Sequence, residues 1–384
     1  MKRTARASWA ICLSLVVVGC GSEATPTPVP TPSPAAIQSA PHQRPSQPSG
    51  TFAVTGPMAI ARGGQTATLL KDGRILVTGG RNGDTSLASA ELFDPVTDVF
   101  STTGGMLTAR DQHAAALLPD GRVLISGGGP SGDLSSAELY DPATGKFSQT
   151  GSMSAVRGKH AAIALLDGRV LIVGGTDDTT DLASAELYDP SSGTFKKTGS
   201  MSAGRDDPAA VLLPDGRVLV AGGLVGATPL ATAEVYDPAT GKFTRTGSMS
   251  TARDGLTAVL MTDGRVLVAG GYGPNTALDT AEIYDPTTRK FAPTGSMHTV
   301  RVGHVSVLLS TGKVLVAGGF DDGTNVAITT AELYDPGTGT FGFTSSLTTG
   351  RESSTATTLQ DGRVVVIGGD VDLGDLDSVE IYQP

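Results

Sequence analysis

The sequence predicts an all-β fold, a seven-bladed β-propeller in which each blade is a four-stranded antiparallel sheet. Three observations predict it. A stretch typified by residues 215–223 (Asp-Gly-Arg-Val-Leu-Val-Ala-Gly-Gly) recurs seven times, and its glycine doublets are spaced by 48, 47, 48, 48, 48 and 50 residues. Each repeat holds four candidate strands, and no segment shows a sustained helical pattern. Four strands per repeat at a period near 48 are typical of propeller blades.

The recurring stretch is predicted to be the second strand of each blade. Residues 218–223 are apolar or glycine on both alternating faces, so this strand must be covered on both sides. The Asp-Gly before it predicts a type I′ hairpin turn. The closing Gly-Gly predicts a sharp bend or the close approach of another backbone. Seven such strands imply sheets stacked face to face.

The other strands follow from the residues around this stretch. An apolar first strand is typified by residues 257–261, a third strand with Glu-x-Tyr by 233–238, and a fourth strand with an aromatic residue by 242–249. The repeats begin at a fourth strand, around Phe52, and end at a third strand, 380–382. We therefore expect the strand around Phe52 to serve as the fourth strand of the last blade, which removes exposed sheet edges.

Residues 1–19 are predicted to be a lipoprotein signal peptide. Lys2, Arg3 and Arg6 precede the apolar run 11–18, which is too short to span a bilayer as a mature helix. Val-Val-Gly-Cys, ending at Cys20, resembles the bacterial lipobox, whose cysteine is acylated and becomes the new N-terminus. This predicts an extracytoplasmic protein held by lipid on a bacterial cell membrane or outer membrane. An ordinary secretory signal, cleaved nearby, is the alternative.

Two further segments are predicted downstream of the signal. Residues 20–50 hold the acylated cysteine and eight prolines, without apolar periodicity, so they are expected to form an extended linker. Residues 51–384 are expected to form the propeller.

Charge narrows the class of partner. Removing three basic residues with the signal leaves 25 Lys and Arg against 38 Asp and Glu, a net charge of 25 − 38 = −13. Proteins that bind nucleic acid need basic patches, so no nucleic-acid partner is expected. An acidic chain favours cationic partners. We expect the membrane to be contacted only through the lipid, and the protein to be a monomer.

The repeat resembles the kelch repeat. The resemblance rests on Gly-Gly after the second strand, Glu-x-Tyr in the third, an aromatic in the fourth and Met-x-x-x-Arg before the first. The Asp-Gly-Arg variant resembles the kelch-type propeller of galactose oxidase. Phenylalanine stands where kelch repeats usually carry tryptophan, but either ring fills the space between blades. The resemblance implies that the end formed by the loops before the first strand and after the second faces a partner.

An arginine and a glutamate recur in every repeat. In an up-down-up-down blade, the first and third strands start at the same end, so the two side chains can meet. One hypothesis is a charged ring for ligand binding. The other is a structural ion pair in each blade, which is favoured because a charge within an apolar strand usually needs a partner. The residues are Arg62, Arg110, Arg157, Arg205, Arg253, Arg301 and Arg351, with Glu91, Glu138, Glu186, Glu234, Glu282, Glu332 and Glu380.

Positions that vary between repeats at the same end are the ligand-binding candidates. Their side chains are expected at the surface, where carboxylates and aromatics would bind a cation, a cationic protein segment or a glycan. A solvated acidic rim that only maintains solubility is the alternative. The candidates are Asp111, His113, His160, Asp206, Asp254, Tyr272, Phe320 and Glu352.

No metal and no cofactor is expected. The run from Asp370 to Asp377, with Asp372 and Asp375, offers hard oxygen ligands for Ca²⁺, but the spacing and the glycine of an EF-hand are absent. His113 and His160 share one repeat position on neighbouring blades. A metal site there would need third and fourth ligands that the spacing does not supply.

The expected function is binding a protein or glycan at the cell envelope, not catalysis. Resemblance to galactose oxidase implies copper-radical oxidation, but that chemistry uses a tyrosine crosslinked to a cysteine. The mature chain keeps only Cys20, so this activity is rejected. The alternative is an envelope sugar mutarotase or epimerase, with Asp111, His113, His160 and Glu352 available for proton transfer. A passive structural lipoprotein is the third hypothesis.

Overall fold

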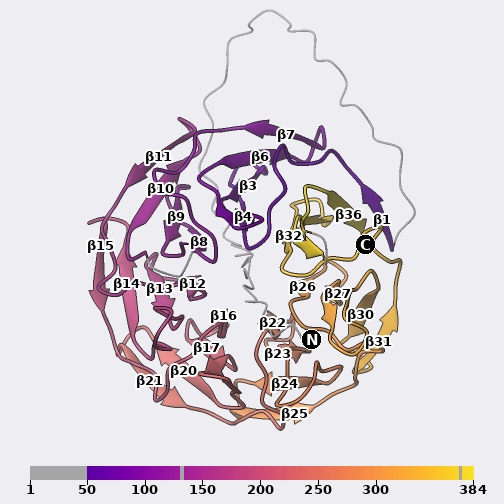
Figure 1. Cartoon of the computed structure of the whole chain (residues 1–384). Coiled ribbons are helices and arrows are strands. Elements are labelled where there is room, and N and C mark those ends of the chain that lie inside the picture. The colour runs from indigo at the N-terminus through magenta and orange to yellow at the C-terminus, as the bar shows by residue number, and fades with distance from the viewer. Residues whose placement is uncertain (1–49, 130–133, 372–373) are drawn as a thin grey trace, which may run out of the picture.

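The computed structural model describes residues 50–129, 134–371 and 374–384 (Figure 1). In these ranges the chain forms seven four-stranded antiparallel sheets arranged in a ring, which confirms the predicted seven-bladed propeller. No helix in these ranges is long and apolar enough to cross a membrane. The predicted signal peptide, Cys20 and the linker up to residue 49 lie outside the described residues. Those assignments stay predictions.

Each of the first three blades consists of four consecutive main strands. Blade 1 contains β2 (Thr66–Leu69), β3 (Ile75–Thr78), β6 (Ala90–Asp94) and β7 (Val99–Thr102). Blade 2 contains β8 (Ala114–Leu117), β9 (Val123–Ser126), β10 (Ala137–Asp141) and β11 (Lys146–Gln149). Blade 3 contains β12 (Ala161–Ala164), β13 (Val170–Val173), β14 (Ala185–Asp189) and β15 (Thr194–Lys197).

The remaining blades repeat this order, except that blade 7 takes its last strand from the start of the ring. Blade 4 contains β16 (Ala209–Leu212), β17 (Val218–Ala221), β20 (Ala233–Asp237) and β21 (Lys242–Arg245). Blade 5 contains β22 (Thr257–Leu260), β23 (Val266–Ala269), β24 (Ala281–Asp285) and β25 (Lys290–Pro293). Blade 6 contains β26 (Val305–Leu308), β27 (Val314–Ala317), β30 (Ala331–Asp335) and β31 (Thr340–Phe343). Blade 7 contains β32 (Thr355–Thr358), β33 (Val364–Ile367), β36 (Val379–Gln383) and β1 (Thr51–Val54).

Among the described residues, short hairpins follow the glycine doublets of four blades, in the loop between the second and third strands. They are β4 (Arg81–Asn82) with β5 (Thr85–Ser86), β18 (Leu224–Val225) with β19 (Thr228–Pro229), β28 (Phe320–Asp321) with β29 (Val326–Ala327), and β34 (Asp370–Val371) with β35 (Gly374–Asp375).

The N-terminal strand closes the ring. β1 pairs with β36 in antiparallel register, with Phe52 opposite Tyr382 and the two ring centroids 4.8 Å apart. The backbone N–H of Phe52 also donates to Ser345 Oγ, next to β31 of the neighbouring blade, at 3.0 Å. The predicted exchange, in which the first strand completes the last blade, is confirmed. It leaves β36 with partners on both sides.

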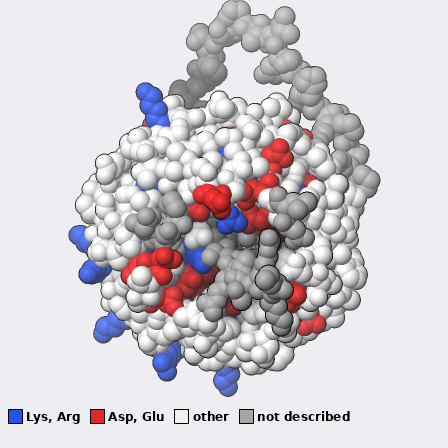
Figure 2. Space-filling model, viewed as in Figure 1, with Lys and Arg blue, Asp and Glu red and all other residues white. Residues whose placement is uncertain are grey.

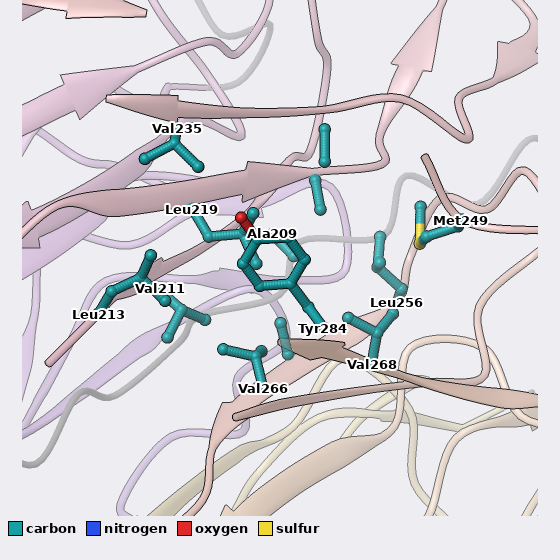
Figure 3. Packing of buried hydrophobic residues seen from close by; sticks show 13 residues of the cluster. Ala209, Val211, Leu213, Leu219, Val235, Met249, Leu256, Val266, Val268 and Tyr284 are labelled. Carbon is teal, nitrogen blue, oxygen red and sulfur yellow. The ribbon is translucent and has the colours of Figure 1, made fainter. Parts of the chain in front are cut away.

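The first strands of neighbouring blades contact one another all the way round, so they line the axis of the ring. All four residues of every second strand are buried, as their two apolar faces predict. Figure 3 shows the core between blades 4 and 5, where Val211 and Leu219 of blade 4 face Val268 and Tyr284 of blade 5. Equivalent clusters occur at the other interfaces between blades.

Aromatic rings join the third and fourth strands. In blade 5 the ring of Tyr284 on β24 lies 4.9 Å from that of Phe291 on β25. The hydroxyl of Tyr284 forms a 2.8 Å hydrogen bond with Thr246 Oγ1 of blade 4. The phenylalanine that replaces the usual kelch tryptophan therefore packs on the aromatic residue of the third strand.

The hairpin between the first two strands differs from the prediction. A type I′ turn needs positive φ at both central residues, but in residues 213–217 only Gly216 has it, at 83°. The N–H of Gly216 donates to Leu213 O at 2.9 Å, and the Asp215 carboxylate accepts from the N–H of Arg217 at 3.1 Å. The predicted I′ turn is wrong, because positive φ is confined to Gly216 and the aspartate instead accepts a hydrogen bond from the backbone two residues on.

The glycine doublet marks a close approach between blades, as predicted. Gly222 and Gly223 have φ values of 66° and 86°, in the left-handed region. A Cβ on Gly222 would lie 2.7 Å from Arg253 O, and one on Gly223 2.5 Å from Asp206 O. The doublet therefore lets the chain turn out of the second strand between Arg253 of the next blade and Asp206 of its own blade.

Candidate functional site at the acidic end of the ring

Each blade carries a buried arginine–glutamate pair at the end where its first strand begins. In blade 5 the Arg253 side chain is 0% exposed, and its Nη2 lies 3.2 Å from Oε1 of Glu282 on β24. The equivalent distances in all seven blades run from 2.9 to 3.5 Å. The seven arginine–glutamate contacts predicted from the internal repeats are therefore present in the structure.

The same pair also satisfies backbone groups. Arg253 Nη1 donates to Gly270 O at 2.9 Å and to Thr280 O at 2.8 Å, while Glu282 accepts from the N–H of Ser250. The pair thus connects the loop before the first strand, the glycine doublet and the third strand. This arrangement supports a structural role, and it leaves the hypothesis of a ligand-binding charged ring without an accessible group.

The residue after each arginine lies three residues before an innermost strand. We call these seven residues the inner positions. Five of them pair through backbone bridges with the residue after the glycine doublet of their own blade, as Asp254 does with Tyr272, and a sixth, Glu352, pairs with Asp370 in the same way. Because the innermost strands line the axis, the inner positions surround one end of it. They are Gly63, Asp111, Gly158, Asp206, Asp254, Val302 and Glu352.

Acidic side chains dominate this end. Four of the seven inner positions are acidic, namely Asp111, Asp206, Asp254 and Glu352. Figure 2 shows acidic side chains gathered around the centre of the face in view, whereas most Lys and Arg side chains that it shows lie towards the outer edge. The variable positions therefore concentrate negative charge around the axis.

Backbone strain follows directly on the inner positions. Four residues one step later have left-handed φ values, which are unfavourable for side chains other than glycine. They are Gln112 (53°), Lys159 (52°), Asp207 (50°) and Ser353 (50°). Neighbouring loops are joined here, because the N–H of Lys159 donates to Gln112 O at 2.9 Å. Such strain is concentrated at functional sites in proteins.

Three of the predicted ligand-binding carboxylates are buried, contrary to the expectation that they lie at the surface. Asp111 and Asp254 are each 6% exposed and Asp206 is 9% exposed, while Glu352 is half-buried. The reason is the close packing of seven loops around a narrow axis. A fully solvated acidic rim is therefore the wrong description of these three.

Asp206 acts on the carboxyl of Asp254 across the interface of blades 4 and 5. Burial raises the pKa of the Asp254 carboxyl to about 6, the Asp206 charge adds to this, and Lys159 opposes it. Burial also raises the pKa of Asp206, against the attraction of Lys159, whose Nζ lies 3.4 Å from Asp206 Oδ2. Oδ1 of Asp206 and Oδ1 of Asp254 have no hydrogen-bond partner.

Two basic residues lie at the acidic end of the ring but were not predicted from the sequence. Lys159 reaches Asp206 from blade 3, and Arg81 Nη2 lies 2.7 Å from Asp370 Oδ2 across the seam between blades 1 and 7. Both are basic at positions where the other repeats are not, a signal that a search for variable basic residues would have found.

The candidate Ca²⁺ run is partly engaged with Arg81. Arg81 Nε lies 3.8 Å from Asp375 Oδ1. Burial, together with the hydrogen bond to Asp375, raises the pKa of Asp370 to about 7, whereas the charge of Arg81 lowers it. Asp372 lies outside the described residues. No group of three or more His, Cys, Asp or Glu side chains within 50–129, 134–371 and 374–384 is arranged to hold a metal ion.

The histidines face the interfaces between blades and not the mouth. His113 Nε2 lies 3.0 Å from Thr66 Oγ1, and His160 Nε2 lies 2.9 Å from Ser126 Oγ. His304 makes the equivalent 2.9 Å contact with Thr257 Oγ1. Burial, with the charge of a neighbouring arginine, lowers the pKa of each imidazole to about 3. The contacts of His113 and His160 give no support to a ligand-binding role, because both imidazoles pack against hydroxyl groups between blades; that role stays a prediction.

Tyr272 and Phe320, the two aromatic candidates, lie beside inner positions. Tyr272 exchanges backbone hydrogen bonds of 2.7 and 3.0 Å with Asp254, and Phe320 does so with Val302 at 2.8 and 3.2 Å. Both rings are half-buried. Tyr272 therefore lies next to the Asp206–Asp254 pair, whereas Phe320 lies beside an apolar inner position.

Replacing Asp254 with asparagine should raise the free energy of unfolding at pH 7.5 by up to about 3 kcal/mol. The folded pKa near 6 exceeds the unfolded value near 3.9, so the folded state binds a proton more tightly. The protonated carboxyl contributes stability that is fully present below about pH 4 and is lost as the pH rises to about 6. The size of the effect follows from about 1.4 kcal/mol for each unit of pKa difference.

Urea melts at pH 4 and pH 7.5 test this expectation. The gain from Asp254→Asn should shrink at pH 4, and Asp84→Asn, which removes an exposed carboxylate, should stay within about 0.5 kcal/mol of wild type at both pH values. A less stable Asp254→Asn protein at pH 7.5 would show that the carboxylate has a compensating partner.

Known proteins with similar sequence motifs or a similar structure agree with this architecture. Residues 63–107, 157–202, 208–250 and 256–298 each match the Kelch motif. A similar solved structure is described as a novel fungal alcohol oxidase with catalytic diversity among the AA5 family, in complex with copper. The TM-score is 0.70 at 20% identity, covering 87% of this chain and 76% of that one, so the likeness shows the fold alone. No curated protein matched the chain.

Proposed function

We propose that this chain, a seven-bladed β-propeller with kelch motifs, is a lipid-anchored binding module that takes a protein or glycan ligand at the cell envelope. Kelch propellers commonly act as protein-interaction modules. The lipobox-like sequence before Cys20 supports the anchor, and the proline-rich residues 21–50 would hold the ring away from the lipid surface.

One observation carries the binding role. The arginine–glutamate scaffold is the same in all seven blades, but the inner positions differ from blade to blade and four of them are acidic. Three of those carboxylates are buried. Burying a carboxylate costs hydration free energy, and the repeated arginine–glutamate scaffold is complete without these side chains. Their retention favours a ligand at this end.

The sugar mutarotase hypothesis gains no support from the described residues. Of its four candidates for proton transfer, Asp111, His113, His160 and Glu352, the two imidazoles are buried against hydroxyl groups of the preceding blade. A general acid or base must reach the substrate. The binding role is therefore the one we propose.

A comparison of two proteins tests the binding role. Residues 50–384, which contain every strand of the closed ring, would be immobilised beside a variant in which Asp111, Asp206 and Asp254 are all asparagine. Envelope proteins and a glycan array would be passed over both. The proposal expects a species retained by the first protein and lost from the second. Identical retention on both, or none on either, would overturn it.

Replacing Cys20 with serine should release the protein from membranes. An acyl chain supplies the membrane affinity in the proposed anchor, and residues 50–129, 134–371 and 374–384 hold no helix that could replace it. Cell fractionation after a salt wash measures the outcome, with Cys12→Ser as the matched control. If Cys20→Ser still sediments with membranes while Cys12→Ser behaves as wild type, the anchor assignment is wrong.

A further inference from the structure

The interface of blades 4 and 5 carries two carboxylates whose hydrogen-bonding capacity is incomplete. Asp254 is 6% exposed, and its Oδ1 has no partner. Asp206 accepts from Lys159 through Oδ2, which leaves its Oδ1 without a partner. Buried carboxylate oxygens are almost always hydrogen-bonded, because an unpaired one forfeits its hydration. Two such oxygens on neighbouring loops point to a missing donor.

The charges at this place do not balance. Asp206 and Asp254 contribute two negative charges and Lys159 one positive charge, so one negative charge remains. Asp181, near enough to influence Asp206, adds to the excess. A ligand with at least one positive group would complete the set.

The geometry favours an ammonium group over the other cations. Ca²⁺ takes six to eight oxygen ligands, and the described residues contain no cluster arranged to hold a metal. A guanidinium prefers two oxygens of one carboxylate, whereas the free oxygens here belong to two different loops. An ammonium is compact and has three donors. Lys159 itself shows that an ammonium is accommodated beside Asp206.

We propose that Asp206 and Asp254 together bind the ammonium group of a lysine side chain presented by a protein partner. Tyr272, held beside Asp254 by two backbone hydrogen bonds and half-buried, offers a ring for the methylene stem of that lysine. The left-handed backbone at Lys159 and Asp207 places strain on the loops that hold Lys159 and Asp206, as in other binding sites. This inference rests on the proposed binding function and names its ligand chemistry.

An N-acetylated, C-amidated pentalysine peptide serves as the probe. It would be titrated into residues 50–384 by calorimetry at low ionic strength, where charge interactions are least screened. Asp254→Asn and Asp206→Asn should each weaken binding about tenfold or more, because each removes a charge-assisted hydrogen bond. Asp84→Asn makes the same change of charge at an exposed position and should alter affinity less than about twofold.

Further arms identify the source of the amine. The same peptide with every lysine acetylated should not bind, and pentaarginine should bind more weakly than pentalysine. Equal weakening by Asp84→Asn and Asp254→Asn would overturn the site, since binding would then follow net charge. Free cadaverine matching pentalysine in affinity would assign the site to small amines and overturn the protein source.

The two proposals fail in different ways. If pentalysine binding survives Asp254→Asn while the envelope ligand is still retained by wild type and lost from the triple variant, the lysine site is wrong and the binding module stands. If no envelope ligand is retained by wild type, the proposed function is wrong whatever pentalysine does.

Discussion

Replacing Glu282 with alanine should lower the free energy of unfolding by about 3–5 kcal/mol, because it leaves a buried arginine without its counterion. The Arg253 side chain is 0% exposed, and burial lowers the pKa of its guanidinium, an effect that the charge of Glu282 opposes. The change also removes the acceptor for the N–H of Ser250. Thermal and urea melts of the variant measure the loss.

Asp263→Ala is the matched control for this experiment. Asp263 and Arg265 form an ion pair of 2.6 Å in the same blade, but both side chains are about two-fifths exposed. Water and salt screen such a pair, so its loss should cost no more than about 1 kcal/mol. A smaller effect for Glu282→Ala than for Asp263→Ala would show that the repeated pair is not what stabilises the blade.

Deleting residues 51–58 should lower the free energy of unfolding by several kcal/mol. The deletion removes β1, its four-residue pairing with β36, the ring of Phe52 against Tyr382, and the buried side chain of Met58. Burying one large apolar side chain contributes about 1.5–3 kcal/mol, so Phe52 and Met58 account for much of the loss. The edge of β36 would also be exposed to other chains.

Melting of residues 50–384 with and without residues 51–58 tests the closure. The shorter protein should unfold at a lower temperature, and amide exchange should be fastest in β36, which loses its outer partner. Equal melting temperatures would show that the ring is stable without its closing strand. Concentration-dependent association of the shorter protein would be the expected consequence of the open edge.

Repetition made the scaffold predictable. Four strands per repeat, the closure by Phe52 and the meeting of Arg253 with Glu282 all follow from spacing within or between equivalent units, and the structure contains each of them. These features depend on local periodicity and on one symmetry rule, that equivalent residues take equivalent places. The kelch resemblance was predictable for the same reason, because its motif is contained in one repeat.

The site depended on contacts between non-equivalent residues. The sequence placed Asp254 at the surface, but the loops of neighbouring blades bury it and bring Asp206 close enough to raise its pKa. Lys159 reaches Asp206 across 47 residues, and Arg81 reaches Asp370 across 289. No spacing rule predicts these pairs, because they arise from the convergence of different loops on one axis.

The sequence by itself therefore determined the blades, their number, their closure and their buried ion pairs, since each is repeated and each is decided by residues a fixed distance apart. Only the tertiary structure decided which variable side chains lose their water. It buried His113 and His160 between blades and left Asp206 and Asp254 with unpaired oxygens at the end of the ring. The physical reason is that burial is a property of the packed ring, whereas periodicity is a property of the chain.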